Sequence, residues 1–367
     1  MKYDLPTTHR SWFRILLTWG LPIAGWSLLI FLWLTAGRGE KEKPAAEVPP
    51  EQPPAAQPAT PSANAAPGAA ATPQAGVGGA TAQPPAAATP AAPAPGATEI
   101  YPSAPYDFAG ALSYVGLSYE RACGTGILVD PVTRKVLWAK SAEKAVPIAS
   151  MTKMMTMLLA EEAIRAGKVA RGTVIPVSVA AYEIGGSQVW LDPKESFPLS
   201  ELMKAIAIKS ANDAAYLVGE YLGGGDIGAF VKEMNRRAKE LGMTHTTFYD
   251  AHGLGDSAKR NNLSSAYDMI LLGEHLLRYP ESMRLASTRM DTFRNGTLDL
   301  KNHNNLVYDR VPGVDGLKTG YTSASGFCVT FSCIRGGRRL LGCVTGFKKA
   351  KERDAFCKAL LAWGYTR

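Results

Sequence analysis

A hydroxyl and an amine that could act as a nucleophile and its base stand three positions apart, at Ser150 and Lys153. The residues after Ser150 predict a buried helix from Met151 to Ala166, because apolar side chains recur with helical spacing at Met151, Met154, Met155, Leu158 and Leu159. Residues three apart share one face of a helix, so the two polar side chains would lie one turn from each other.

A serine hydroxyl becomes a strong nucleophile only when a base removes its proton. A lysine can do this if burial or positive neighbours lower its pKa from about 10.4. The start of a helix also offers backbone N–H groups to a developing oxyanion. By itself S-x-x-K is a short pattern, and Ser150 could equally be a helix cap with Lys153 a solvated residue of the first turn.

Two further motifs follow. Ser210-Ala211-Asn212 alone would be ordinary helix-capping chemistry. In Lys318-Thr319-Gly320 the lysine and the hydroxyl suit a carboxylate, and the glycine permits close backbone approach. The order S-x-x-K, S-x-N, K-T-G, about sixty and then about a hundred residues apart, is the signature of penicillin-recognising serine enzymes.

At these motifs the sequence resembles the D-alanyl-D-alanine carboxypeptidases of peptidase family S11, the low-molecular-mass penicillin-binding proteins. The resemblance runs from about Tyr119 to Tyr365 and is carried by the residues around each motif as well as by the motifs. The matching segments are residues 148–156, 185–187, 210–215, 253–254 and 313–320.

The resemblance implies that Ser150 attacks the D-Ala–D-Ala bond of a peptidoglycan stem peptide, and that water hydrolyses the acyl-enzyme. Lys153 would be the general base, Ser210 would relay a proton to the leaving amine, and Asn212 would hold Lys153 and the substrate amide. The substrate-binding residues that it implies are Lys318, Thr319, Gly320, Tyr321, Thr322 and Ser187. The backbone N–H groups of Ser150 and Tyr321 would form the oxyanion hole. β-Lactams would acylate the same serine, and neither metal nor cofactor is implied.

Alternatives within and outside this chemistry remain open. A D,D-endopeptidase that cuts cross-links uses the same residues, and a non-catalytic penicillin-binding wall protein could keep the same pocket. A class A β-lactamase needs a glutamate within E-x-x-x-N between the second and third motifs. None of five glutamates after the second motif has an Asn four residues later: Glu220, Glu233, Glu240, Glu274 and Glu281.

The sequence also departs from the family's usual Asn-Pro or Asn-Ser step before Gly253-Leu254, because Asp250-Ala251-His252 occupies these positions. We expect this to affect substrate preference rather than catalysis.

The elements that must position these residues can be outlined. Two β-hairpins are predicted, one near the start of the folded region and one near its end. The first pairs residues 126–130 with 136–139, and the second pairs 327–334 with 339–346 across a turn at Gly336-Gly337. Amphipathic helices are expected between them, at 199–208, 214–222 and 228–241, and a last helix at 352–363 would cover the sheet. The resemblance implies an α/β (α+β) β-lactamase/transpeptidase-like fold, with a central antiparallel sheet, flanking helices and an all-helical subdomain.

The first hundred residues have a different composition. Residues 15–36 form an uncharged apolar run long enough to span a bilayer, and the run exceeds the usual apolar stretch of a cleaved signal peptide. We therefore predict a cytoplasmic N-terminus at 1–14, a single membrane span at 15–36, an Ala/Pro-rich disordered linker at 37–104, and a catalytic domain at 105–367 outside the cytoplasmic membrane. A cleaved signal peptide is the competing interpretation.

Composition excludes several other classes. The formal net charge is +8, but the basic residues are scattered and no run of five occurs, which argues against nucleic-acid binding. Five histidines without H-E-x-x-H spacing argue against a metal site. The five cysteines contain no C-x-x-C pair and are interpreted as small buried residues. One disulfide among Cys328, Cys333 and Cys343 would be possible in an oxidising compartment.

Overall fold

The computed structural model describes residues 101, 104–256, 258 and 260–367. The predicted cytoplasmic segment, membrane span and nearly all of the predicted linker lie outside these residues. Within the described part of the chain, no helix combines the length and the apolar character that crossing a membrane requires.

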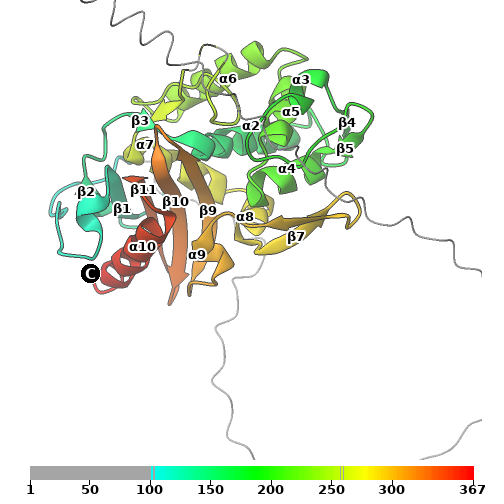
Figure 1. Cartoon of the computed structure of the whole chain (residues 1–367). Helices are drawn as coiled ribbons and strands as arrows, with labels where there is room; N and C mark the ends of the chain where they lie inside the picture. The colour runs from blue at the N-terminus through cyan, green and yellow to red at the C-terminus, as the bar shows by residue number, and fades with distance from the viewer. Residues whose placement is uncertain (1–100, 102–103, 257, 259) are drawn as a thin grey trace, which may run out of the picture. The chain divides into compact units, whose positions relative to one another are not determined.

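A five-stranded antiparallel sheet forms the centre of this part of the chain. Its strands are β1 (Gly126–Asp130), β2 (Lys135–Lys140), β9 (Val314–Thr322), β10 (Gly326–Arg335) and β11 (Arg338–Phe347). They are arranged in the order β2-β1-β11-β10-β9, so the first strands of the fold pair with the last ones (Figure 1). The predicted sheet built from two distant hairpins is therefore confirmed.

Both faces of the sheet are covered, which explains why its strands are nearly continuous runs of buried residues rather than alternating ones. Helix α10 (Ala350–Gly364) packs on β10 and β11 on one face, as predicted, through Phe356, Leu360 and Leu361. Helix α7 (Ala266–Leu277) contacts β1, β10 and β11 on the other face. The turn between β10 and β11 has Gly336 and Gly337 at φ +56° and +78°, a conformation that glycine adopts without strain.

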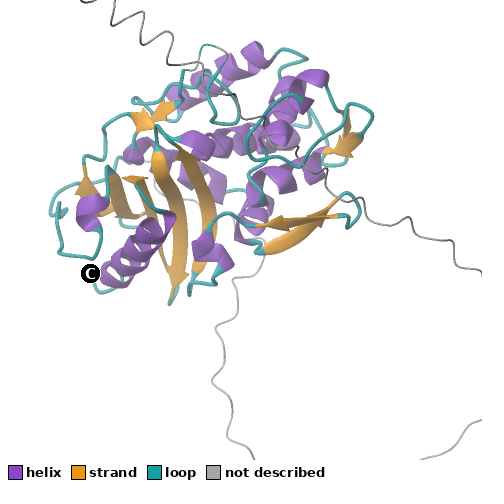
Figure 2. Cartoon of the chain, in the orientation of Figure 1, coloured by secondary structure: helices purple, strands orange, loops and turns teal. Residues whose placement is uncertain are grey.

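A helical subdomain lies beside the sheet (Figure 2). Its main helices contact one another and are α2 (Lys153–Arg165), α4 (Leu199–Ile208), α5 (Asn212–Leu222) and α6 (Ile227–Glu240). These match the four predicted helices to within a few residues at their ends. The subdomain is not purely helical, because it also carries the strand pair β4 (Val174–Pro176) and β5 (Ser196–Pro198) next to the short helix α3 (Val179–Tyr182).

Several elements were not assigned from the sequence. They are η1 (Glu120–Ala122), β3 (Val146–Pro147), β6 (Leu263–Ser264), α8 (Pro280–Ser287), β7 (Met290–Phe293), β8 (Leu298–Lys301) and α9 (Asn305–Tyr308), besides β4, α3, β5, α7 and β9. The β3 and β6 pair brackets the serine motif, since Pro147 pairs with Leu263 and the N–H of Ile148 donates to the carbonyl of Asn262 at 3.2 Å. The strand pair thus fixes the chain just before Ser150.

All five cysteines lie in the described part of the chain, and each is a buried free thiol. Burial raises the pKa of Cys343 and Cys357, which are packed within the two apolar clusters on either side of the sheet. The disulfide considered among Cys328, Cys333 and Cys343 is not formed, and the interpretation as small buried side chains holds.

Candidate active site

Ser150 stands in a tight turn at the start of α2. It lies in the 3₁₀ turn η2 (Ala149–Thr152), and α2 begins at Lys153. The turn begins with Ala149 at φ +47°, a conformation that costs a non-glycine residue free energy and is often found at functional sites. The helix predicted from Met151 is thus a regular α-helix only from Lys153, and the residues just before it form a 3₁₀ turn. This turn leaves Ser150 half-buried at the edge of a cleft.

Lys153 is completely buried, and its amine has three oxygen neighbours. The Nζ atom lies 2.9 Å from Ser150 Oγ, 2.6 Å from Asn212 Oδ1 and 2.6 Å from the carbonyl oxygen of His252. A neutral amine has two N–H donors and one lone pair. Because the two carbonyl oxygens can only accept, they take both donors, and the lone pair is left facing the hydroxyl of Ser150.

The electrostatics of the site favour this neutral form. Burial lowers the pKa of Lys153 well below its usual value, and the nearby charge of Lys318 lowers it further. The carboxylates of Asp250 and Asp213 act in the opposite direction and are the weaker influence. The geometry and the direction of the pKa shift therefore agree that Lys153 can accept the proton of Ser150.

Asn212 is held by the loop that contains Ser187. Its Nδ2 donates to the carbonyl of Gly185 at 2.8 Å, and its backbone N–H donates to the carbonyl of Ser187 at 2.7 Å. The Ser187 hydroxyl donates in turn to the carbonyl of Lys209 at 2.8 Å. Asn212 is also the first residue of α5, so a helix, a loop and a side-chain network together fix the amide that orients Lys153.

Ser210 faces the same cleft in a strained backbone conformation. Its φ is +62°, and its buried Oγ has no hydrogen-bond partner among the residues that the structure describes. A buried hydroxyl without a partner costs free energy. An oxygen in this state, on the wall of the cleft, is available to bond with a bound molecule.

The strand β9 forms the opposite wall. A Cβ atom at Gly320 would lie 2.6 Å from the carbonyl oxygen of Ile148 and 3.2 Å from Ala149 Cβ, so only glycine lets the strand pass so close to the serine turn. Thr319 lines the cleft, and Tyr321 is 56% exposed and stacks on Phe327 with 4.1 Å between ring centroids. Thr322 is not brought to the wall, because its N–H and hydroxyl bond with Ser325 at 2.9 and 3.0 Å.

Lys318 is buried within this wall, with 3% of its surface exposed, and its amine donates to the carbonyl of Thr319 at 3.2 Å. Burial, followed by the charge of Arg353, lowers its pKa to about 7. Arg353 is itself buried and donates to the carbonyl of Cys328 at 3.1 Å and to Asp354 Oδ1 at 2.8 Å. Lys318 and Arg353, whose own charge is paired with Asp354, are thus the cationic side chains of this part of the cleft, and both suit a carboxylate.

These walls enclose a cleft of about 410 Å³. Its lining combines the three sequence motifs with residues from other parts of the chain, namely Ser150, Gly186, Ser187, Ser210, Asn212, Leu254, His303, Asn305, Thr319, Gly320, Tyr321, Phe327, Ala350 and Arg353. Of the ten predicted site residues, seven line the cleft, Lys153 and Lys318 are buried beside it, and Thr322 lies outside its lining.

The backbone partner of Lys153 could not be predicted from its own motif. The loop at Asp250-Ala251-His252 was expected to bear on substrate preference, but the carbonyl of His252 also accepts the Lys153 amine. Asp250 shapes this loop by accepting the N–H groups of His252 at 2.7 Å, of Gly255 at 2.8 Å and of Gly253. An Asp followed by glycines at the third and fifth positions is a turn signal that could have indicated such a loop.

Arg353 and His303 were missed as well. Nothing in the sequence around either residue marks it as part of a site, because both come from segments that reach the cleft only in the folded chain.

Across the described residues, no group of three or more His, Cys, Asp or Glu side chains could hold a metal ion.

Comparison with known proteins places the chain among cell-wall peptidases. The family model described as D-alanyl-D-alanine carboxypeptidase matches residues 117–349. The chain is 38% identical over 246 residues to D-alanyl-D-alanine carboxypeptidase DacF of Bacillus subtilis, and this covers 66% of this chain and 62% of that protein. It is 35% identical to DacA of Escherichia coli, over 65% of this chain and 60% of that one. It thus spans about 60% of the length of these curated relatives.

A relative that is named for a different activity also matches. D-alanyl-D-alanine endopeptidase of Escherichia coli is 30% identical over 220 residues, which is 59% of this chain and 68% of that protein. Among solved structures, penicillin-binding protein D2 of Listeria monocytogenes, in its ampicillin-bound form, has a TM-score of 0.61 at 29% identity, with coverage of 69% of this chain and 99% of that one. Penicillin-binding protein 6B of Escherichia coli has a TM-score of 0.63 at 29% identity, with coverage of 71% and 81%. The expected β-lactamase/transpeptidase-like fold is therefore shown for the described part of the chain.

Proposed function

Because this chain belongs to the D-alanyl-D-alanine carboxypeptidase family of peptidases, we propose that it removes the terminal D-alanine from peptidoglycan stem pentapeptides through an acyl-enzyme on Ser150. The observation that carries the proposal is the buried Lys153 amine, which lies 2.9 Å from Ser150 Oγ and 2.6 Å from each of two carbonyl oxygens. As a neutral amine it would give its two N–H groups to these oxygens and turn its lone pair toward the Ser150 hydroxyl. The alcohol that needs activation and the base that can activate it are already in place.

In the first half of the reaction, Lys153 takes the proton of Ser150 as Oγ attacks the carbonyl carbon of the penultimate D-alanine. The backbone N–H groups of Ser150 and Tyr321 receive the oxyanion. When the C–N bond breaks, the proton passes from Lys153 to the leaving amine, with the unpartnered hydroxyl of Ser210 as its relay. D-Alanine departs, and the acyl group remains on Ser150.

In the second half, water attacks the ester and Lys153 acts again as the base. Asn212 holds the amine through both halves at 2.6 Å. The terminal carboxylate of the substrate binds to Thr319 and to the positive charge of Lys318 and Arg353. That charge comes from the buried end of the cleft, where little water competes for the carboxylate.

The same groups would accept β-lactams as covalent inhibitors. A β-lactam places a strained amide next to a carboxylate, as the D-Ala–D-Ala end of a stem peptide does with its own amide. The ampicillin-bound form of the Listeria monocytogenes protein, which shares this fold at 29% identity, supports this part of the proposal. A neutral Lys153 beside Ser150 supplies what the acylation step needs.

Endopeptidase activity on cross-linked peptides is the second candidate, supported by the 30% identity to the Escherichia coli endopeptidase. Both activities cleave a bond on the carboxyl side of a D-alanine with the same nucleophile. They differ only in whether the leaving group is a free D-alanine or a second peptide. The cleft must therefore be tested with both substrates.

We further propose that residues 15–36 hold the protein in the cytoplasmic membrane as a single span, with residues 105–367 on the outer side. The uncharged apolar run, long enough to cross a bilayer, supports this, and the linker would give the catalytic domain reach into the wall. Peptidoglycan and the membrane would then be its physiological surroundings.

The function is tested by incubating the full chain with a purified pentapeptide and with a cross-linked muropeptide dimer, followed by product mass. We expect loss of one D-alanine from the pentapeptide and no product from the Ser150→Ala control. Cleavage of the dimer alone would assign the endopeptidase function instead. If Ser150→Ala still released D-alanine, the proposed mechanism would be wrong.

A further inference from the structure

A second cavity adjoins the active-site cleft. It has a volume of about 700 Å³ and lies between α5, α6 and the loops around residues 183–185 and 249–256. Leu254 lines both cavities, and Gly185 on the wall of the second is followed directly by Gly186 on the wall of the first. The second cavity therefore borders the cleft at Leu254.

The second cavity borders the groups that hold the catalytic lysine. His252 lines it, and the carbonyl of the same residue accepts the Lys153 amine at 2.6 Å. Gly185 lines it as well, and its carbonyl fixes the Asn212 amide at 2.8 Å. A molecule in this cavity would thus contact His252, which holds the Lys153 amine directly, and Gly185, which holds it through Asn212.

The shared wall offers a peptide a route out of the cleft. By the proposed function, Thr319 and Arg353 receive the terminal carboxylate, and Ser150 marks the scissile carbonyl. Leu254 lines both cavities, and Gly186 lines the cleft next to Gly185 of the second cavity. A peptide that extends past Leu254 and Gly186 would therefore reach the second cavity.

The lining of the second cavity suits a peptide. Tyr216, Tyr249, Ile227 and Val231 give it an apolar and aromatic interior, while Lys232 and Glu183 add charge at its exposed margin. The Tyr216 ring lies 6.4 Å from the His252 ring, centroid to centroid. A stem pentapeptide has three residues before its D-alanine pair, and three extended residues reach about 10 Å.

We propose that this second cavity binds the part of the peptide substrate on the amino-terminal side of the D-alanine pair, and that its occupancy steadies Lys153 through His252 and Gly185. The inference rests on the proposed function and specifies its substrate as a stem peptide of full length. Binding energy from these remote residues is used in the chemical step, so a long substrate gains in kcat as well as in KM.

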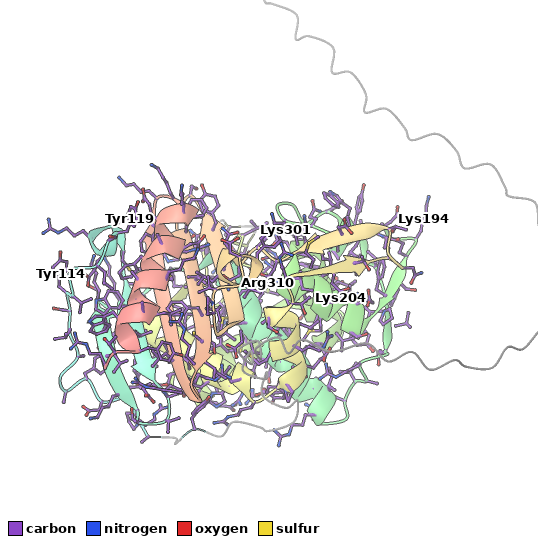
Figure 3. The ribbon with its side chains drawn as sticks, turned by 90° about the horizontal axis from the view of Figure 1, so that it is seen from below. Tyr114, Tyr119, Lys194, Lys204, Lys301 and Arg310 are labelled. Atoms are coloured by element: carbon purple, nitrogen blue, oxygen red, sulfur yellow. The ribbon has the colours of Figure 1, made fainter. Side chains whose placement is uncertain are left out.

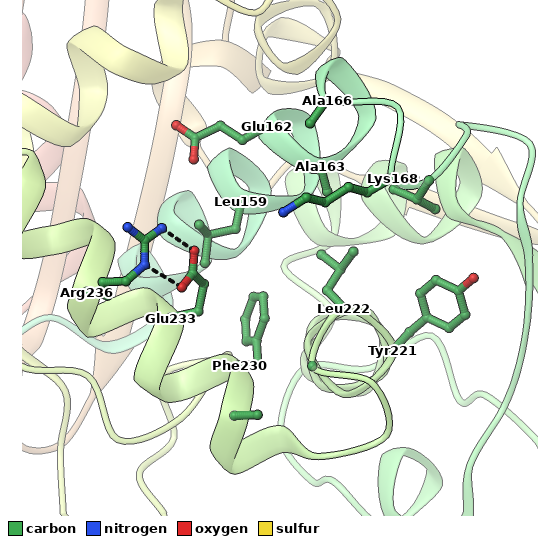
Figure 4. Close-up of a pocket in the computed structure, with 13 residues that line it drawn as sticks. Leu159, Glu162, Ala163, Ala166, Lys168, Tyr221, Leu222, Phe230, Glu233 and Arg236 are labelled. Carbon is green, nitrogen blue, oxygen red and sulfur yellow. Dashed lines mark hydrogen bonds and ion pairs between the residues drawn. The ribbon is translucent and has the colours of Figure 1, made fainter.

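Helix α6 provides a matched pair of variants. Ile227 and Val231 face the second cavity, whereas Ala229 and Phe230 face a different cavity between α2, α5 and α6. That other cavity has Leu159, Leu222 and Phe230 in its lining, and Glu233 and Arg236 form an ion pair at its edge (Figure 4). Val231→Trp fills the proposed subsite, and Ala229→Trp places the same side chain on the same helix but in the other cavity.

The experiment compares kcat/KM for a stem pentapeptide and for N-acetyl-D-Ala-D-Ala, and records acylation by benzylpenicillin for each variant. Val231→Trp is expected to lower the ratio of the two kcat/KM values by about tenfold or more, since it removes contacts that only the longer peptide makes. Ala229→Trp is expected to leave the ratio as in the wild type. Ile227→Phe, a smaller change, carries the same prediction if Val231→Trp does not fold.

An unchanged ratio in folded Val231→Trp and Ile227→Phe, or an equal fall in Ala229→Trp, would overturn the subsite. These outcomes are separate from failure of the proposed function. Loss of the function would appear as absent acylation of Ser150 in the wild type, whereas failure of the subsite would leave acylation intact and remove only the preference for the longer substrate.

Discussion

At the scale of single residues, the chemistry depends on one lone pair. Lys153 can serve as a base only while its amine is neutral, and two carbonyl oxygens at 2.6 Å make the remaining direction of the amine face Ser150. Lys318 has the opposite requirement, because a carboxylate binds to its charged form. Burial lowers the pKa of both lysines. It therefore favours the neutral form that Lys153 needs as a base, and it reduces the fraction of Lys318 that carries the charge needed to bind a carboxylate.

This opposition predicts a pH dependence. With its pKa at about 7, Lys318 is charged below that pH and loses its proton above it. We predict that kcat/KM for a substrate with a free terminal carboxylate falls between pH 7 and pH 9, by up to about tenfold per pH unit. The fall at acid pH belongs to Lys153, which must be deprotonated to act.

Two controls test the assignment to Lys318. Arginine stays charged throughout this range, so Lys318→Arg should flatten the alkaline fall even if its absolute rate is lower. A substrate whose terminal carboxylate is amidated should show no alkaline fall with the wild type. An alkaline fall of the same size in Lys318→Arg would show that another group titrates.

Residues were predictable where three short motifs, each ambiguous alone, occur together in the order and context of a known family. Ser150, Lys153, Ser210, Asn212 and Thr319 were found from the sequence, and the structure brings them together. The carbonyl of His252 could not be found this way, because a backbone oxygen has no sequence signature. Arg353 was equally hidden, since an arginine within a C-terminal helix is usually a solvated residue.

At the scale of elements, the position of Ser150 depends on close contact with the loop at Gly253. Gly253 has φ +95°, and a Cβ there would lie 2.0 Å from the carbonyl oxygen of Ala149 and 2.8 Å from the backbone nitrogen of Ser150. The residue before it holds Lys153 through its carbonyl. This loop thus sets the positions of both Ser150 and Lys153.

We predict that Gly253→Ala slows acylation by benzylpenicillin on the order of 100-fold, because a displacement of about 1 Å between reacting groups has an effect of that size. Gly242→Ala is the matched control. Gly242 has a similar φ of +74°, but no atom lies within 4 Å of its added Cβ, so the substitution brings backbone strain without a clash. Similar acylation rates in the two variants would contradict the spacing role of Gly253.

Elements were predictable where their hydrophobic pattern is strong. The hairpins of the central sheet show as apolar runs on either side of turn residues, and the helices α4, α5 and α6 show amphipathic repeats, so both could be assigned. Helix α7 was overlooked because it is buried on nearly all sides, so its apolar residues form no stripe. The pair β3 and β6 is too short for any periodic signal, yet it sets the start of the serine turn.

At the scale of the whole molecule, charge and composition divide the chain. Residues 1–100 contain equal numbers of acidic and basic side chains, so the net charge of +8 lies entirely in residues 101–367. Figure 3 shows Lys194 apart from Lys204, Lys301 and Arg310, which lie near the middle of that view. Lys204 is paired with Glu201 at 2.9 Å, and the Lys301 amine lies 4.0 Å from the centroid of the Tyr308 ring.

The apolar run at 15–36 supplies the prediction at this scale. We expect the protein to sediment with membranes and to resist extraction by salt, because an apolar span is held by hydrophobic rather than ionic interactions. N-terminal sequencing of the mature chain should find residues that precede the span. A mature N-terminus near Gly37 or Arg38 would instead identify a cleaved signal peptide.

The most direct test of the central claim is mass-spectrometric peptide mapping after incubation of the full chain with benzylpenicillin. The account predicts one covalent adduct, located on Ser150, and no adduct in a Lys153→Gln variant, which keeps a polar side chain but lacks a base. An adduct on a different residue, or acylation of Ser150 at an unchanged rate in Lys153→Gln, would contradict the pairing of these two side chains.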